Sequence, residues 1–145
     1  MIRAAILPER SVLRISGEDA RHFLHNLVTS NIEALLPGEA RFAALLTPQG
    51  KVLFDFFVLA IAEDEGGGFF LDAPKALAPE LAKRLGFYKL RARVAVEPRP
   101  DLAVAVVFER EAPEETGFAF KDPRHSKLGT RIILPAQDAE SALKG

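Results

Sequence analysis

Residues 52–61, VLFDFFVLAI, constrain the fold more than any other segment, because they are apolar at every position except Asp55. A strand whose two faces are both apolar has to be covered on both sides. The preceding TPQG places Pro48 and Gly50 at the second and fourth positions of a tight turn, which suits type I. Ala40–Leu46, which is apolar except for Arg41, is expected to be extended on the other side of that turn. The sequence therefore predicts a β-hairpin inside a layered domain.

The other apolar segments are short and are separated by turn residues. Further strands are expected at residues 2–7, 11–15, 69–71, 93–96, 102–108, 118–120 and 131–134. Many of these strands follow one another without a helix between them. This order is typical of the α+β class, with antiparallel sheets and packed helices, and differs from the regular alternation of a parallel nucleotide-binding sheet.

Two segments have the apolar spacing of an amphipathic helix. The first follows Ser16 and Asp19, which fit a capping box, and the second begins at Pro74. Their apolar faces consist of Ala20, Phe23, Leu24, Leu27 and Val28, and of Leu77, Leu81, Leu85 and Tyr88. The remaining expectations are a helical turn ending at Leu36, a polar loop at residues 109–115 and a weak helix at residues 136–143.

Composition excludes several classes of function. The chain has 145 residues, a formal net charge of −1 and no cysteine. This length suits one domain with a core, and the charge gives no general attraction to nucleic acid or to membranes. Without cysteine, this segment forms no disulfide, thiolate zinc site or cysteine nucleophile. No apolar run reaches membrane-spanning length, and the start, MIRAAILPER, lacks the apolar stretch of a secretory signal. We expect a cytoplasmic protein that does not bind membranes.

Asp55 is the residue that most strongly suggests a site. Both faces of its strand read as buried, so the sequence predicts that its carboxylate is removed from water. Because an unpaired buried carboxylate is costly, it needs a partner or a function. The carboxylate either accepts N–H bonds from a ligand or acts as a base, or it is a structural acid bonded to a turn or to an arginine. The residues alone leave both alternatives open.

Other polar residues give weaker indications. Thr47, Gln49 and Lys51 lie at the mouth of the predicted hairpin, where they could hold a ligand, although most such turns are only solvated. His22 and His25 are three residues apart on the first helix, but no further ligand accompanies them, and we expect them to face solvent. No motif identifies a catalytic residue or a metal site.

The segment KRLGFYKLRARV at residues 83–94 mixes basic and aromatic residues. Such a mixture binds nucleic acid or anionic ligands in some proteins. Cations also favour the last turn of a helix, so a solvated helix end explains the same residues. The near-zero net charge argues against nucleic acid, whereas one arginine could still reach the anionic tail of a ligand.

Four segments stand in a characteristic order and spacing: VLRISGEDARHFLHNLVTSNI, PGEARFAALLTPQGKVLFDFFV, LDAP and FYKLRARVAV. Together they resemble the YgfZ-type folate-binding proteins. These proteins are relatives of the glycine-cleavage T-protein, an aminomethyltransferase, and of mitochondrial iron–sulfur assembly factors. The four segments span residues 12–96, and DPRHSKLGTRIIL extends the similarity more loosely.

The resemblance implies a fold and a role. The fold is that of the aminomethyltransferase folate-binding domain, built from two swapped β-α-β units, with the first unit and the start of the second present here. Residues 1–145 are then an incomplete folate-binding domain without the family's C-terminal barrel domain. The implied cofactor is tetrahydrofolate, bound in a central cavity. The implied role is assembly or maintenance of iron–sulfur clusters in client proteins, linked in bacteria to tRNA modification. The ligand-binding residues are expected to be Asp55, Lys51, Gln49, Thr47 and Arg91.

Two departures from the family pattern keep alternatives open. The T-protein has an Asp-Asp pair where this chain has Phe54-Asp55, which puts aminomethyl transfer in doubt. The family's Lys-Gly-Cys-Tyr-x-Gly-Gln-Glu segment is absent from these residues. One alternative is a folate-dependent one-carbon transferase in which Asp55 is the acid. Another is a non-catalytic half-domain that is completed by a partner chain, including a second copy of itself.

Overall fold

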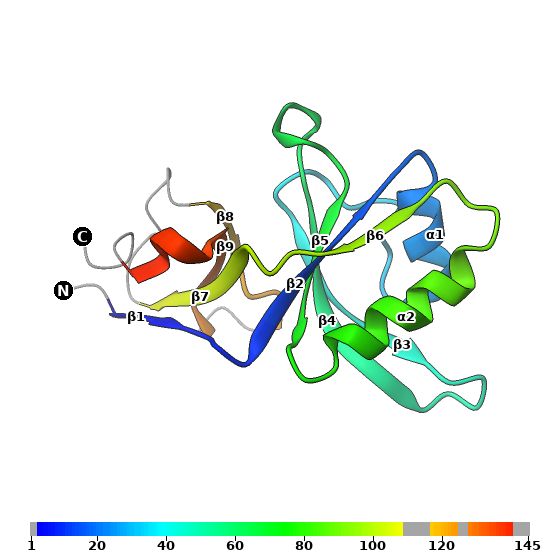
Figure 1. Ribbon diagram of the computed structural model, residues 1–145, viewed down its shortest axis with the longest axis horizontal. Helices are drawn as coiled ribbons and strands as arrows, with labels where there is room; N and C mark the ends of the chain where they lie inside the picture. The colour runs from blue at the N-terminus through cyan, green and yellow to red at the C-terminus, as the bar shows by residue number, and fades with distance from the viewer. Residues whose placement is uncertain (1–2, 109–116, 125–127, 141–145) are drawn as a thin grey trace.

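The computed structural model describes residues 3–108, 117–124 and 128–140, and its strands form two antiparallel sheets (Figure 1). The five-stranded sheet has the order β3-β4-β5-β2-β6. Its strands are β3 (Ala40–Leu46), β4 (Val52–Ala60), β5 (Phe69–Pro74), β2 (Arg10–Ser16) and β6 (Ala95–Pro98). The hairpin predicted around the TPQG turn forms one side of this sheet, and β4 is paired on both of its edges.

The four-stranded sheet has the order β1-β7-β9-β8. Its strands are β1 (Arg3–Ile6), β7 (Leu102–Phe108), β9 (Thr130–Pro135) and β8 (Phe118–Lys121). The N-terminal strand β1 thus pairs with β7, about a hundred residues later, whereas its neighbour in sequence, β2, belongs to the other sheet. The chain crosses between the sheets at residues 7–9, where the Leu7 N–H donates to the Val104 carbonyl at 2.8 Å.

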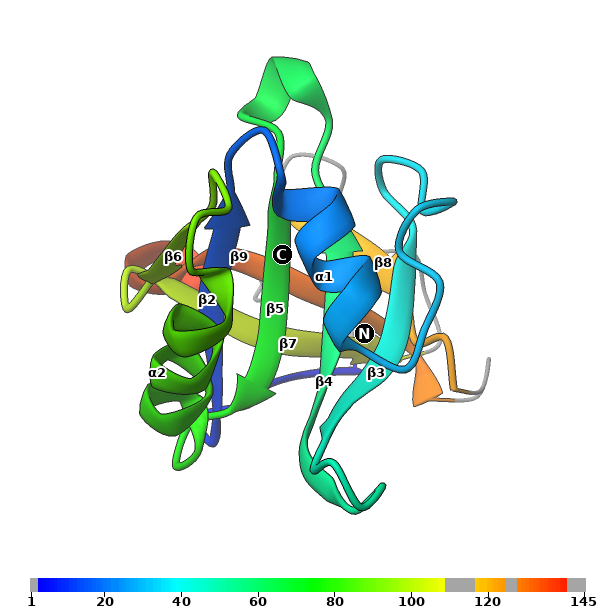
Figure 2. The same cartoon turned by 90° about the vertical axis from the view of Figure 1, so that its right-hand side faces the viewer.

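The elements form three layers. Helices α1 (Ala20–Leu27) and α2 (Ala78–Lys89) cover one face of the five-stranded sheet, and the four-stranded sheet covers the other, with its strands running across those of the first (Figure 2). Even-numbered residues of β4, such as Phe56 and Val58, pack under the helices. Odd-numbered residues, such as Phe57 and Leu59, pack between the sheets. The predicted double-sided burial of this strand is therefore confirmed over its second half.

The predicted strands are confirmed with small changes at their ends, and so is the α+β class. The capping box is wrong. No side chain caps α1, because the Asp19 carboxylate accepts instead from the backbone N–H of Arg93 at 2.8 Å. Gly17, whose φ is +114°, makes this approach possible, because a Cβ there would lie 2.2 Å from the Arg93 carbonyl oxygen.

The helical turn expected to end at Leu36 is reduced to a single turn, in which the Leu35 N–H donates to the Ile32 carbonyl at 3.1 Å, and side chains of α1 explain why. Arg21 Nη1 donates to the carbonyls of Ile32 and Leu35 at 2.8 and 2.7 Å. Nδ1 of His25 accepts from the backbone N–H groups of Ile32 and Glu33 at 3.1 and 3.2 Å. Because side chains satisfy these backbone groups, the turn does not continue into a helix.

Differences also occur near the C-terminal side. The predicted helix over residues 136–143 begins as the 3₁₀ turn η3 (Ala136–Asp138), and its last residues lie outside the described part of the chain, as does the loop expected at 109–115. A 3₁₀ turn, η1 (Glu63–Glu65), forms in the connection between β4 and β5. None of the described helices is both long and apolar enough to cross a membrane.

Candidate functional site

Asp55 is exposed, so the prediction of a buried carboxylate at this position is wrong. It lies on the face of β4 that carries Phe57 and Leu59, both of which are 2% exposed under the four-stranded sheet. That sheet does not extend over Asp55. Val52, the first residue of β4, lies on the opposite face of the strand and is 61% exposed. Strand alternation gave the face of Asp55 correctly but could not show how far along β4 the second sheet reaches.

The buried acid is Asp72 of β5, which is 1% exposed. Arg10 Nε donates to its Oδ1 at 2.7 Å, and Arg131 Nε donates to its Oδ2 at 2.8 Å. Asp72 lies beside Phe57 in the β4–β5 register. Asp72 is not among the site residues predicted from the sequence. The same signal that drew attention to Asp55, a lone acid in an apolar strand, was present in FFLDA.

Phe57 is the centre of a cluster of cations. The guanidinium carbons of Arg131, Arg124 and Arg10 lie 4.4, 4.9 and 5.8 Å from the centroid of its ring. The ring of Phe42 lies beside it, with centroids 5.1 Å apart, and Arg124 also lies over Phe42 at 5.3 Å. Cations at such distances are attracted by the faces of aromatic rings. We refer to this aromatic and cationic cluster between the two sheets, formed by Phe42, Phe57 and the three arginines, as the floor.

Arg124 lies between the rest of this floor and the exposed first half of β4, called the rim, which carries Asp55. It donates from Nε and Nη2 to Oδ1 and Oδ2 of Asp122 at 3.0 and 2.7 Å. The hydrogen bond from Arg124 to Asp122 raises the pKa of Arg124, and the negative charges of Asp72 and Asp55 add to this effect. The Arg124 side chain is 42% exposed. The described cluster therefore has one cation at the surface, within the electrostatic influence of the exposed Asp55 carboxylate.

The structure brings Thr47, Gln49 and Lys51 together at the hairpin turn. The backbone N–H of Gly50 donates to the Thr47 carbonyl at 2.9 Å, and the N–H of Lys51 donates to Thr47 Oγ1 at 3.1 Å. Thr47 thus holds the turn, while Gln49 and Lys51 are exposed. Lys51 directly precedes β4 and is four residues from Asp55, about 13 Å at the usual rise per residue of an extended chain.

Arg91 is not brought to this region. It lies in the connection between α2 and β6, and β6 and β3 are the opposite edges of the five-stranded sheet. Four strand spacings separate those edges, about 19 Å in the plane of a sheet. The predicted site residues therefore fall into two groups, with Arg91 alone in the second.

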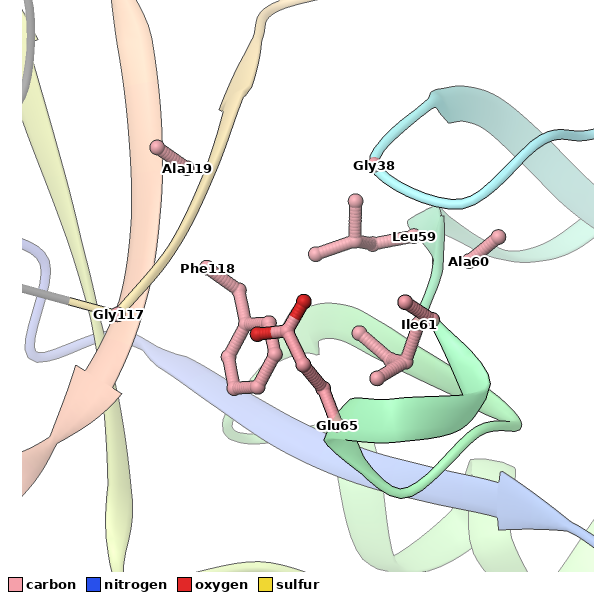
Figure 3. Close-up of a pocket in the computed structure, with 9 residues that line it drawn as sticks. Gly38, Leu59, Ala60, Ile61, Glu65, Gly117, Phe118 and Ala119 are labelled. Carbon is pink, nitrogen blue, oxygen red and sulfur yellow. The ribbon is translucent and has the colours of Figure 1, made fainter. Parts of the chain in front are cut away.

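A cavity of about 300 Å³ lies at the other end of the space between the sheets, and none of the predicted site residues lines it. Leu59, Ile61 and Phe118 contribute apolar walls, and the Glu65 carboxylate points toward the Phe118 ring (Figure 3). Among the described residues, no group of three or more metal-ligating side chains could hold a metal ion.

The chain is similar in sequence to two kinds of protein. No protein-family model matches it. The human mitochondrial iron–sulfur cluster assembly factor IBA57 is 32% identical over 158 residues, which cover 94% of this chain and 44% of that protein. The aminomethyltransferase of Stenotrophomonas maltophilia is 33% identical over 134 residues, which cover 88% of this chain and 35% of that protein. The chain thus spans less than half the length of these relatives.

The fold agrees with these relatives. The crystal structure of the glycine cleavage system aminomethyltransferase T from Bartonella henselae superposes with a TM-score of 0.78 at 17% sequence identity. The superposition covers 98% of this chain and 45% of that one, so the predicted aminomethyltransferase-like fold is confirmed for a partial domain. The sequence similarity and the fold together support a relationship between this chain and the superfamily that contains the aminomethyltransferases and the IBA57 iron–sulfur cluster assembly factors.

Proposed function

We propose that the chain binds tetrahydrofolate and serves as an accessory protein in the assembly or maintenance of iron–sulfur clusters, in the manner of the YgfZ-type proteins linked to tRNA modification. The similarity to the human IBA57 factor, of which the chain spans 44%, supports the iron–sulfur part. The aminomethyltransferase-like fold supports the folate part. Iron–sulfur enzymes are the proposed clients.

The position of Asp55 is the observation that carries the ligand proposal. Its carboxylate is exposed at the rim, and no described residue donates a hydrogen bond to it. Beside it lie the Arg124 guanidinium and the half-buried Phe42 ring of the floor, whereas the Phe57 ring beneath them is only 2% exposed. A pterin is flat and carries ring N–H and amino groups, so a free carboxylate next to a guanidinium plane and an aromatic ring fits it in both shape and hydrogen bonding.

The polar end of the ligand has a corresponding group of residues. Lys51 and Gln49 are exposed at the hairpin turn, and Lys51 is about 13 Å from Asp55 along the extended chain, which is within the length of an extended folate. The carboxylates of the folate tail would pair with the Lys51 ammonium, while Thr47 keeps the turn in place. Arg91, at the opposite edge of the sheet, is not included in this site.

Calorimetric titration of tetrahydrofolate into the chain tests the ligand proposal. We expect Asp55→Asn to weaken binding about tenfold, because an amide still accepts a hydrogen bond but lacks the charge. Asp64→Asn, at another exposed acid in η1, is the matched control and should bind like the wild type. If the wild-type chain gives no heat of binding and no thermal shift with tetrahydrofolate, the proposal is contradicted and the half-domain alternative is favoured.

The iron–sulfur role needs a separate measurement. Deleting the gene in its own host should lower the activity of iron–sulfur enzymes and leave enzymes without clusters unchanged. The intact gene should restore that activity, and the Asp55→Asn gene should not if the folate site serves this role. Unchanged activity of iron–sulfur enzymes after deletion contradicts the role.

A folate-dependent one-carbon transferase is the second candidate. The exposed Asp55 carboxylate favours it, because an acid at an open rim can exchange protons with a bound substrate. Tetrahydrofolate carries the one-carbon unit in such reactions. A transferase consumes a one-carbon donor together with an acceptor, and Asp55→Asn then abolishes turnover while sparing much of the binding. An accessory protein shows binding without turnover.

A further inference from the structure

The C-terminal part of α2 and the loop to β6 expose an unusual set of apolar side chains. Leu90, Phe87 and Tyr88 are 86%, 64% and 41% exposed. The inward side of the same helix is well buried, with Leu81 and Leu85 at 0%. The end of α2 lies at the far side of the molecule from the four-stranded sheet (Figure 1). These exposed residues are therefore not remnants of the contact between the sheets.

Basic residues surround this apolar group. Residues 83–93 contain Lys83, Arg84, Lys89, Arg91 and Arg93 and no acid, although the chain as a whole has a net charge of −1. Arg93 pairs with Glu18 at 2.6 Å, and Lys89 Nζ donates to the Val94 carbonyl at 3.5 Å. No hydrogen bond or ion pair joins Lys83, Arg84 or Arg91 to another described residue. Three cations thus remain available to a partner.

Helical spacing puts aromatic and basic groups on one side of α2. Arg84 and Phe87 are three residues apart, which places them together on the outward face of the helix, and Tyr88, at 41% exposed, lies at the border with the buried face of Leu81 and Leu85. Arg91 continues the series directly after the helix ends at Lys89. The outward side of α2 is therefore a stripe with apolar groups in the middle and guanidinium groups at both ends.

Leu90 provides a second, independent observation. Its φ is +40°, and it is the only non-glycine residue of the described chain with a positive φ. Such a backbone suits glycine, because a Cβ makes the left-handed region unfavourable. A leucine that is 86% exposed contributes little burial to offset this strain. Strained residues that the fold itself does not require are concentrated at functional sites.

We propose that residues 83–93 form a docking surface for an acidic segment of a partner protein. Leu90 and Phe87 are the apolar anchors, and Arg84 and Arg91 pair with carboxylates of the partner. An apolar centre with an arginine rim is the usual composition of a protein interface. Nucleic-acid binding depends on many phosphate contacts, which a chain of near-zero net charge supports poorly. The surface is independent of the proposed folate site, because α2 and Asp55 are on opposite faces of the five-stranded sheet.

Fluorescence anisotropy with the full chain and a short labelled peptide of Glu, Asp, Leu and Phe tests this proposal. Leu90→Gly and Phe87→Ser should each weaken binding about tenfold, and the Arg84→Glu, Arg91→Glu double variant should also reduce the salt dependence. Leu36→Ser and Lys121→Glu are matched controls at exposed positions elsewhere, and they should bind within about twofold of the wild type.

Folding and alternative partners are checked in the same experiment. Leu90→Gly removes a side chain from a glycine-like backbone, so its Tm should not fall even though its binding weakens. All variants should titrate tetrahydrofolate like the wild type, which separates this surface from the folate site. The proposal is overturned if the wild type does not bind the peptide, or if the control variants lose as much affinity as the stripe variants. It is also overturned if single-stranded RNA or phosphatidylserine vesicles bind and the peptide does not.

Discussion

Asp72 and Arg131 meet between the two sheets, with Arg131 Nε and Nη2 each 2.8 Å from Asp72 Oδ2. Their side chains are 1% and 8% exposed. Arg10 completes the arrangement at Oδ1, so one carboxylate joins strands β2, β5 and β9. No described buried side-chain polar atom lacks a hydrogen-bond partner. This ion-pair network fixes how the four-stranded sheet sits on the five-stranded one.

Asp72→Ala should therefore lower the free energy of unfolding by about 3–5 kcal/mol, because it leaves two cations without their buried counter-charge. Chemical denaturation of the wild type and the variant measures the difference. Asp101→Ala, which breaks the more exposed pair between Arg99 and Asp101, is the control and should cost much less. Similar losses in the two variants would show that the buried network does not hold the sheets together.

Asp122 should make the protein sensitive to acid. Burial raises its pKa, but the hydrogen bonds from Arg124 outweigh burial and hold the pKa below 3.8. A carboxyl with a lowered pKa stabilises the fold above the unfolded value and loses that contribution as the pH falls through the folded value. The Tm of the wild type should exceed that of Asp122→Asn by a constant amount near pH 6, and the gap should shrink below pH 3.8. A gap that does not change with pH contradicts this assignment, and Asp64→Asn is the control.

His25 should contribute to stability, contrary to the expectation that it only faces solvent. Its Nδ1 accepts from the backbone N–H groups of Ile32 and Glu33, so it holds the segment before β3. His25→Ala should lower the free energy of unfolding by about 1–3 kcal/mol, because the backbone N–H groups of Ile32 and Glu33 lose their acceptor and the first of these bonds is part-buried. His22, whose side chain is 75% exposed, is the matched position, and His22→Ala should have a much smaller effect. Thermal unfolding followed by circular dichroism compares the two.

Asp55→Asn should change the free energy of unfolding by less than about 0.5 kcal/mol, because substitutions at exposed, unpaired positions rarely do more. Urea denaturation measures the change. A larger destabilisation would show that Asp55 has a structural partner, and the loss of ligand binding by this variant could then no longer be assigned to the ligand. Asp64→Asn again provides the reference.

Local patterns predicted the strands and helices well, because they depend on neighbours a few residues apart. The alternation in β4, the TPQG turn and the apolar stripe of α2 at Leu81 and Leu85 were all readable in this way. The capping of α1 was not, since Asp19 bonds to Arg93, 74 residues later. The segment before Leu36 forms only one turn for a related reason, because the side chains of Arg21 and His25 bond to its backbone groups.

The candidate site likewise has features that the local sequence predicted and features that it did not. The sequence by itself determined the α+β class, the hairpin that carries Asp55 and the face of β4 on which it lies. Only the tertiary structure decided that Asp55 is exposed and that Asp72 is the buried acid, with partners 62 and 59 residues away along the chain. Periodicity fixes the direction in which a side chain points. Whether water, a cation or another sheet meets it there depends on how distant strands pack, and a single sequence does not contain that information in local form.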